Sequence, residues 1–213
     1  MKKLRLAVLI SGTGRSLKNL LERIEDGTLS AEVAVVISSS EHAKGLQFAE
    51  MASVPIEIID RIDYHSHEEF GNAIFDVCRK AKVDLGVMAG YVKLLNIPGD
   101  FHNRVLNIHP SLVPAFSGKG FYGQRVHTEA LRYGVKVSGC TVHFVDNEYD
   151  NGPVILQKTV EVFEDDTPDD LNDRVFAMEC VAYPEAIQLI AEGRVSVRGR
   201  KVRIAPPDDQ EDY

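Results

Sequence analysis

The chain has 213 residues, of which 44% are hydrophobic and 26% charged, the composition of an ordinary folded protein. Its 32 acidic and 24 basic residues give a net charge of −8, which argues against non-specific binding of nucleic acid, because such binding needs basic surface to displace counterions. The three cysteines form no Cys-x-x-Cys pair and are odd in number. They therefore predict neither a disulfide framework nor a zinc site, and they suit a reducing compartment.

The apolar runs of the sequence are short. The first run, 4–10, contains Arg5 and is shorter than a signal-peptide core. No run approaches the ~20 residues that a membrane-spanning helix requires. We therefore expect a cytoplasmic protein that makes no contact with a membrane.

The first half of the chain alternates between two kinds of segment. Short runs rich in Val, Ile and Leu predict buried strands at 4–10, 34–37, 55–59 and 83–89. Between them, apolar residues at three- and four-residue spacing predict helices at 16–26, 41–52 and 66–82. This alternation favours right-handed crossovers. It therefore predicts a doubly wound α/β fold, with a mostly parallel open sheet and helices on both faces.

The second half is less regular. Further strands are expected at 105–108, 136–145 and 154–160, a glycine- and aromatic-rich loop at 115–126, helices at 124–133 and 168–192, and a hairpin at 195–204. Thr167 followed by Pro168 and two acidic residues is a typical helix start. We expect one domain over residues 1–205 and a disordered acidic tail over 206–213.

A glycine-containing turn joins the first expected strand to the first expected helix. It reads Ser11-Gly12-Thr13-Gly14-Arg15-Ser16. Glycines let the backbone approach an anion closely, and the free amides of a helix N-terminus donate to it. The turn lacks the third glycine of the dinucleotide-binding fingerprint, because Leu17 stands there, and it lacks the spacing of the Walker motif. It is therefore either an anion-binding turn or a plain strand-to-helix turn.

Two further features carry polar groups suited to catalysis. Asn107 and His109 are two residues apart on an expected strand, so their side chains share one face. An amide beside an imidazole suits stabilisation of an oxyanion combined with proton transfer, although a lone histidine is more often bonded to a local carbonyl. Asp150 precedes Gly152-Pro153 and is either a turn former or a partner that raises the pKa of an imidazole. The histidines show no metal-binding spacing, so we expect no metal.

Taken together, these segments resemble the phosphoribosylglycinamide formyltransferases, folate-dependent enzymes of purine synthesis. The resemblance extends from Leu4 to about Gly193. Besides the glycine turn, its marks are the runs AGYVKLL at 89–95, NIHPSLVP at 107–114, SGCTVHFV at 138–145 and DNGP at 150–153. The Asn-x-His-Pro-Ser-Leu element alone is similar in methionyl-tRNA formyltransferases and formyltetrahydrofolate deformylases, whereas the combination favours the first family. The resemblance implies a Rossmann-like formyltransferase fold.

The resemblance also implies three groups of site residues. The nucleotide substrate would be bound by Gly12, Gly14, Arg15, Ser16 and Glu179. The folate would be bound by His67, Val92, Lys93, Leu94, Leu95 and Asn107. The catalytic residues would be Asn107, His109 and Asp150.

The reaction implied by the resemblance passes the formyl group of 10-formyltetrahydrofolate, the cosubstrate, to the amine of glycinamide ribonucleotide, a step of de novo purine (IMP) biosynthesis. The amine attacks directly through a tetrahedral intermediate. Asn107 and protonated His109 would stabilise the oxyanion, while Asp150 keeps the imidazole charged. Two alternatives stay open: a related enzyme with another acceptor, such as the water of a deformylase, and a non-catalytic phosphometabolite-binding module. The chain would act as a monomer or a homodimer.

Overall fold

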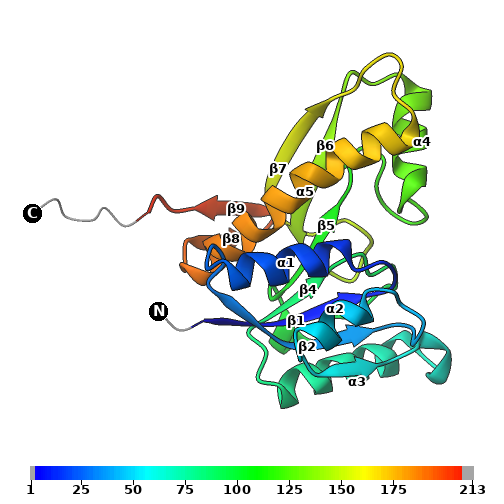
Figure 1. Cartoon of the computed structure of the whole chain (residues 1–213). Helices are drawn as coiled ribbons and strands as arrows, with labels where there is room; N and C mark the ends of the chain where they lie inside the picture. Colours follow the sequence, from blue (N-terminus) through cyan, green and yellow to red (C-terminus); the bar gives the residue numbers. More distant parts are fainter. Residues whose placement is uncertain (1–2, 208–213) are drawn as a thin grey trace, which may run out of the picture.

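The computed structural model describes residues 3–207 and shows a central sheet of seven strands in the order β3-β2-β1-β4-β5-β6-β7 (Figure 1). The parallel strands are β1 (Leu4–Ile10), β2 (Ala31–Ser38), β3 (Ile56–Ile58), β4 (Leu85–Met88) and β5 (Val105–His109). The antiparallel strands are β6 (Val137–Phe144) and β7 (Val154–Glu161). The predicted α/β class and mostly parallel open sheet are confirmed.

Helices cover both faces of this sheet, because alternate residues of β1 enter two different cores. Leu6 packs in the core that contains residues of α1 (Arg15–Glu25) and α5 (Pro168–Ala191). Leu9 packs in the core that contains residues of α3 (His67–Lys80). The strand therefore carries apolar residues on both faces, as a doubly wound sheet requires. The two short 3₁₀ helices are η1 (Arg61–Asp63) and η2 (Gly99–Phe101).

The predicted helix over 41–52 is shorter in the structure, where α2 spans only Leu46–Met51. The residues before it pack against the glycine turn instead. A Cβ added to Gly14, which has φ +71°, would lie 2.4 Å from the Cα of Gly45, and the Gly45 N–H donates to the Gly12 carbonyl over 2.9 Å. This contact between two backbones stops the helix from beginning earlier and requires glycine at both positions.

Helix α5 fixes the sheet near its carboxyl edge. It begins with the predicted Thr167 cap, which forms a capping box with Asp170. The hydroxyl of Tyr183, on the same helix, lies 3.0 Å from the Met88 carbonyl and 3.1 Å from the Leu106 carbonyl. One buried side chain therefore ties α5 to the end of β4 and to the neighbouring strand β5.

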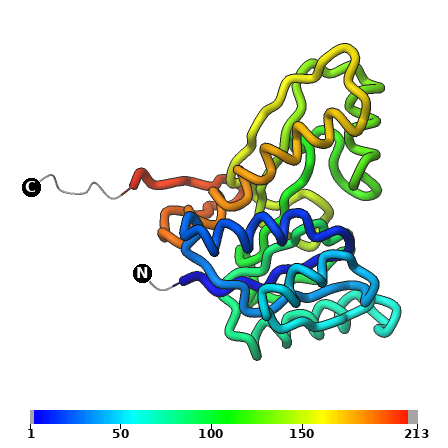
Figure 2. The backbone as a smooth tube through the Cα atoms, viewed as in Figure 1, coloured from blue at the N-terminus to red at the C-terminus, as the bar shows by residue number. Residues whose placement is uncertain are grey.

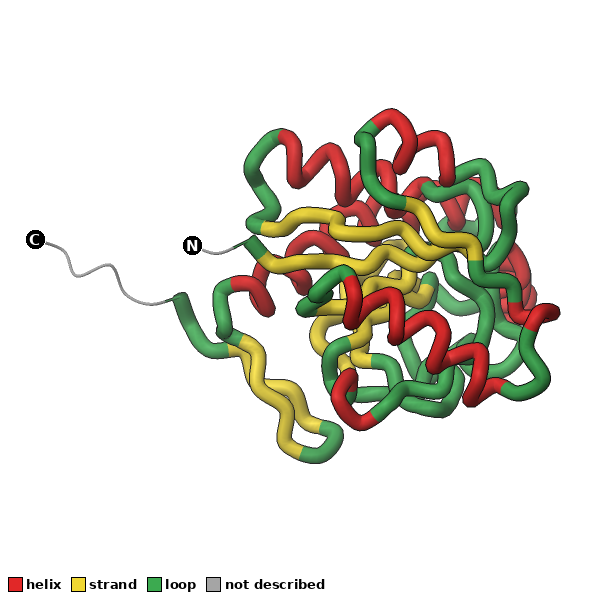
Figure 3. Tube along the Cα trace, turned by 90° about the horizontal axis from the view of Figure 1, so that it is seen from below, coloured by secondary structure: helices red, strands yellow, loops and turns green. Residues whose placement is uncertain are grey.

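The rest of the chain extends from the parallel part. Strands β6 and β7 and helix α4 (Gln124–Tyr133) lie beyond β5, and the backbone trace shows α5 running beside them (Figures 1 and 2). The predicted hairpin forms as β8 (Val195–Arg198) and β9 (Lys201–Ile204), which project from the body (Figure 3). Of the predicted acidic tail, 208–213 lie outside the described residues. Within residues 3–207, no helix is long and apolar enough to cross a membrane.

Candidate active site

A cavity of about 340 Å³ lies at the carboxyl edge of the sheet, where β1, β4 and β5 end. The chain reverses its winding direction between β1 and β4, which is the usual ligand position in such folds. Of the predicted site residues, those that line the cavity are Arg15, Ser16, Val92, Lys93, Leu94, Leu95, Asn107, His109, Asp150 and Glu179. The remaining three, Gly12, Gly14 and His67, are not among its lining residues.

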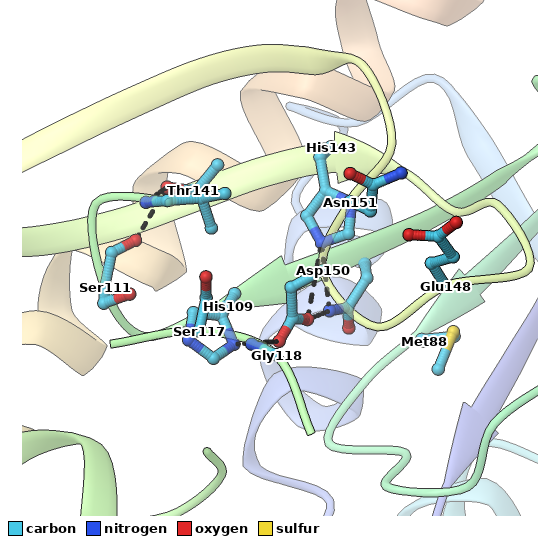
Figure 4. Close-up of polar contacts among 12 residues, drawn as sticks. Met88, His109, Ser111, Ser117, Gly118, Thr141, His143, Glu148, Asp150 and Asn151 are labelled. Atoms are coloured by element: carbon cyan, nitrogen blue, oxygen red, sulfur yellow. Dashed lines mark hydrogen bonds and ion pairs between the residues drawn. The ribbon is translucent and has the colours of Figure 1, made fainter. Parts of the chain in front are cut away.

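Four polar side chains meet at one end of the cavity and form the catalytic cluster: Asn107, His109, His143 and Asp150. Figure 4 labels the last three of them. Asn107 and His109 leave the end of β5 on the same face, as their spacing predicted. Asp150 follows β6 in a turn and lies 3.4 Å from His109, measured from Oδ2 to Nδ1. The sequence placed each residue near a strand end but did not show that Asp150 reaches His109.

Two N–H donors hold Asp150 as an anion. Its Oδ2 accepts from the Gly118 N–H over 2.9 Å, and its Oδ1 accepts from Asn107 Nδ2 over 3.3 Å. Burial acts to raise the pKa of Asp150, but neighbouring groups, among them the His109 imidazole and the Gly118 amide, outweigh it, so the pKa is lowered. Asp150 itself adopts φ +50°, a left-handed conformation that aspartate tolerates better than most residues.

His109 lies between two acceptors. Its Nε2 is 2.9 Å from the carbonyl oxygen of Phe116, and its Nδ1 faces the Asp150 carboxylate. Burial lowers the pKa of His109 below its usual value, because it outweighs the Asp150 charge and the Phe116 carbonyl, which act in the opposite direction. The charged imidazole that the resemblance implies therefore depends on Asp150, the only acid in contact with the ring within residues 3–207.

The sequence reasoning missed His143 as a member of the cluster. His143 pairs with Asn107 across the antiparallel β5–β6 ladder. Its Nδ1 lies 2.7 Å from the Phe144 carbonyl, and therefore carries the proton, so its Nε2 accepts from Asn107 Nδ2 over 3.2 Å. The two hydrogens of the Asn107 amide are thus directed to His143 and Asp150. The alternation in 136–145 assigned His143 to a face, but no sequence signal gave its partner strand.

The segment after His109 is held tightly beside the cluster. The Ser111 hydroxyl donates to the Ala115 carbonyl over 2.5 Å, and the Thr141 hydroxyl donates to the Ser111 carbonyl over 2.7 Å (Figure 4). Phe116 adopts φ +49°, which is uncommon for an aromatic residue. These contacts fix the Phe116 carbonyl against His109. The loop that begins here closes one side of the cavity.

A second part of the cavity lining is the helical wall, formed by residues of α1, α4 and α5: Arg15, His127, Asn172, Phe176 and Glu179. The three residues from α5 are spaced by four and three positions and so share one helix face. The Arg15 guanidinium carbon lies 3.7 Å from the centre of the Phe176 ring. Burial raises the pKa of Glu179 to about 7, and the charge of Arg15 acts against this shift.

The segment 92–95 lines a third side of the cavity, beside the glycine turn. The Val92 N–H lies 3.3 Å from the Ser11 hydroxyl, which also accepts from Ser39 over 2.8 Å. Val92 is 46% exposed and Leu95 is buried, so the segment presents an apolar surface to the cavity. His67 lies at the start of α3, where the preceding Ser66 caps the helix by accepting from the Glu69 N–H.

These groups suit acyl transfer. A carboxylate paired with an imidazole can move a proton, an amide beside them can donate to an oxyanion, and a helix N-terminus with Arg15 can hold an anion. Among residues 3–207, no group of three or more His, Cys, Asp and Glu side chains is placed to hold a metal ion.

Comparison with known proteins identifies the family. The model of the formyl transferase family matches residues 4–187. Phosphoribosylglycinamide formyltransferase of Haemophilus influenzae is 37% identical over 93% of this chain and 91% of its own length. The chain belongs to this family. A glycinamide ribonucleotide transformylase from Symbiobacterium toebii, known as a crystal structure, superposes on this formyl transferase with a TM-score of 0.90 and 45% identity, covering 96% of this chain and 95% of that one.

A larger relative shows the same segment within a longer protein. The trifunctional purine biosynthetic protein adenosine-3 of Gallus gallus is 41% identical over 92% of this formyl transferase, which spans only 19% of that protein. The resemblance to the family and its Rossmann-like formyltransferase fold are thus confirmed. The role of each site residue stays a prediction.

Proposed function

We propose that the chain transfers the formyl group of 10-formyltetrahydrofolate to the amine of glycinamide ribonucleotide in purine biosynthesis. The observation that carries this proposal is the catalytic cluster at one end of a cavity that also holds an anion-binding helix start and an apolar segment. The family and the printed names of its relatives support the same reaction. Residues 1–205 would act as one formyltransferase domain.

The proposed chemistry is a direct attack. The neutral amine of the nucleotide forms a C–N bond to the formyl carbon, and the carbonyl oxygen becomes an oxyanion. Collapse of this intermediate breaks the bond to N10 of the folate, and the proton lost by the amine passes to N10. In this scheme the cluster stabilises the oxyanion through Asn107 and His109 and moves the proton through His109, with Asp150 stabilising the imidazolium.

His109 has one ring nitrogen suited to this task. Because Nδ1 faces Asp150, Nε2 is the atom that would turn to the substrate, and it would exchange the Phe116 carbonyl for the oxyanion. The Asn107 amide, which now donates to His143 and Asp150, would likewise redirect one hydrogen. Without substrate, His109 Nε2 and the Asn107 amide thus donate to groups of the protein, and the reacting atoms would take the place of these acceptors.

The remaining site predictions are assigned to the two substrates. The nucleotide phosphate would lie at the start of α1, on Arg15, Ser16 and the turn that contains Gly12 and Gly14, and its ribose hydroxyls would donate to Glu179. The folate would pack on 92–95, with its tail towards His67 at the start of α3. We further propose that the enzyme acts in the cytoplasm, as a monomer or a homodimer.

A two-tube assay tests this function. Purified protein is mixed with 10-formyltetrahydrofolate with and without glycinamide ribonucleotide, and both deformylated folate and nucleotide mass are measured. We expect deformylated folate only with the nucleotide, together with a nucleotide heavier by one formyl group. Release without the nucleotide would identify a deformylase. Absence of release in both tubes, with the protein folded, would favour the binding module.

A further inference from the structure

The helical wall contains a histidine whose ring makes no hydrogen bond. His127 lies on α4, is 1% exposed and lines the cavity. Neither Nδ1 nor Nε2 has a hydrogen-bond partner among the residues that the structure describes. Buried polar atoms are normally paired, and an unpaired pair of ring nitrogens is costly for a ligand-free protein.

The other two buried histidines of the cavity differ from His127. Each ring nitrogen of His109 and His143 faces a protein acceptor or donor. Asn172 on α5 lies beside the His127 ring and its amide acts to raise the pKa of His127, but no hydrogen bond forms between them. The protein therefore places His127 in the cavity wall without supplying a hydrogen bond to either ring nitrogen.

His127 stays neutral across the physiological range. Burial and, to a smaller extent, a charge on the neighbouring His109 lower the pKa of His127 to about 4. A neutral imidazole has one N–H donor and one acceptor nitrogen. One of these nitrogens can pair with the Asn172 amide beside the ring, which leaves the other for a polar group of a substrate in the cavity.

The position of His127 indicates which part of the nucleotide its ring would contact. It lies close enough to His109 to respond to the charge there, and Asn172 beside it shares an α5 face with Glu179. In the proposed binding mode, the amine is at His109 and the ribose at Glu179. The group that joins the ribose to the aminomethyl carbon is the carboxamide of the glycinamide, and it would pass the His127 ring.

We propose that His127 binds the carboxamide of the formyl acceptor through a hydrogen bond from one ring nitrogen, while the Asn172 amide pairs with the other. The inference rests on the proposed function. In this mode the ring would turn about its Cβ–Cγ bond, so that a nitrogen that is now buried reaches the cavity that the ring already lines.

The test compares His127→Phe, which keeps a ring of similar shape without nitrogens, with His127→Gln, which keeps one donor and one acceptor. KM for glycinamide ribonucleotide, KM for the folate and the thermal midpoint are measured for each. We expect His127→Phe to raise the nucleotide KM about 10- to 100-fold, to leave the folate KM unchanged, and to keep or raise the midpoint, because no hydrogen bond is lost. His127→Gln should recover most of the nucleotide KM.

Val126→Ala is the matched control, because Val126 is a buried neighbour on α4 that does not line the cavity. It should lower the midpoint and leave both KM values unchanged. A His127→Phe variant with a lower midpoint and an unchanged nucleotide KM would show a purely structural histidine and overturn the inference. If the parent protein formylates no glycinamide ribonucleotide, the proposed function itself fails, which is a separate outcome.

Discussion

The catalytic cluster and the helical wall line the same cavity, yet their polar groups are paired differently. In the cluster, Asn107, His109, His143 and Asp150 hydrogen-bond one another or nearby backbone. In the wall, His127 has no hydrogen bond among the described residues, and Glu179 carries a pKa raised by burial. The protein thus orients the polar side chains of the cluster before substrate arrives, whereas it supplies no hydrogen bond to the His127 ring of the wall.

This difference predicts how variants divide between rate and affinity. Loss of a cluster residue should lower kcat, because its interactions strengthen in the transition state. Loss of a wall residue should raise the nucleotide KM, because its interactions are made to the bound substrate. Each prediction below tests that division.

The largest effect is expected for His109→Ala. Removing the imidazole takes away both proton transfer and a donor to the oxyanion, so kcat should fall about 1,000-fold or more. Nucleotide binding, measured by calorimetry, should change little. His102→Ala, which removes an exposed histidine outside the cavity, is the control. Near-normal turnover of His109→Ala would remove this residue from the mechanism.

Asp150→Asn should lower kcat about 100-fold. Asparagine tolerates the left-handed backbone at this position, so the fold should persist. The Asp150 charge raises the pKa of His109, and its loss therefore lowers that pKa further. If turnover needs the imidazolium, the alkaline fall of the pH–rate profile moves to lower pH. An unchanged profile of the same height would contradict this role.

For the wall, Glu179 gives a pH-dependent prediction. Its pKa of about 7 means that the carboxyl loses its charge, and one acceptor, as the pH falls from 8 to 6. The nucleotide KM of the parent should rise up to about tenfold over that range. Glu179→Gln should have a high KM that changes less with pH. Parallel pH dependences of the two proteins would show that another group titrates.

The smallest effect is expected for Phe176→Leu. This change removes the ring under the Arg15 guanidinium but keeps an apolar residue, and a cation–π contact of this kind corresponds to about a threefold change in affinity. The nucleotide KM should rise by that factor, with kcat unchanged. Phe163→Leu removes a similar contact to Arg174, away from the cavity, and should leave the nucleotide KM unchanged.

The sequence predicted the elements that carry the site better than the contacts between them. Strong local signals, such as the apolar run of β1 and the Thr167 cap, gave boundaries close to those observed. The helix over 41–52 was predicted too long, because the packing of Gly45 on Gly14 joins two segments that are distant in sequence.

The same limit applies to the site. Asn107 and His109 share a face through local geometry, so their proximity was predictable. The approach of Asp150 and His143 depends on the register of β5 with β6, which no local pattern sets. His127 falls on a correctly predicted helix. Its place beside Asn172 of α5, 45 residues away, depends on tertiary packing, and so does its lack of a hydrogen bond.

The most direct measurement determines kcat and nucleotide KM side by side for the parent, His109→Ala and His127→Phe. We expect the first variant to lose kcat with little change in KM, and the second to lose affinity for the nucleotide while its kcat at saturation stays within about threefold of the parent. If both variants lower kcat alone, or both raise KM alone, the division between the cluster and the wall is wrong.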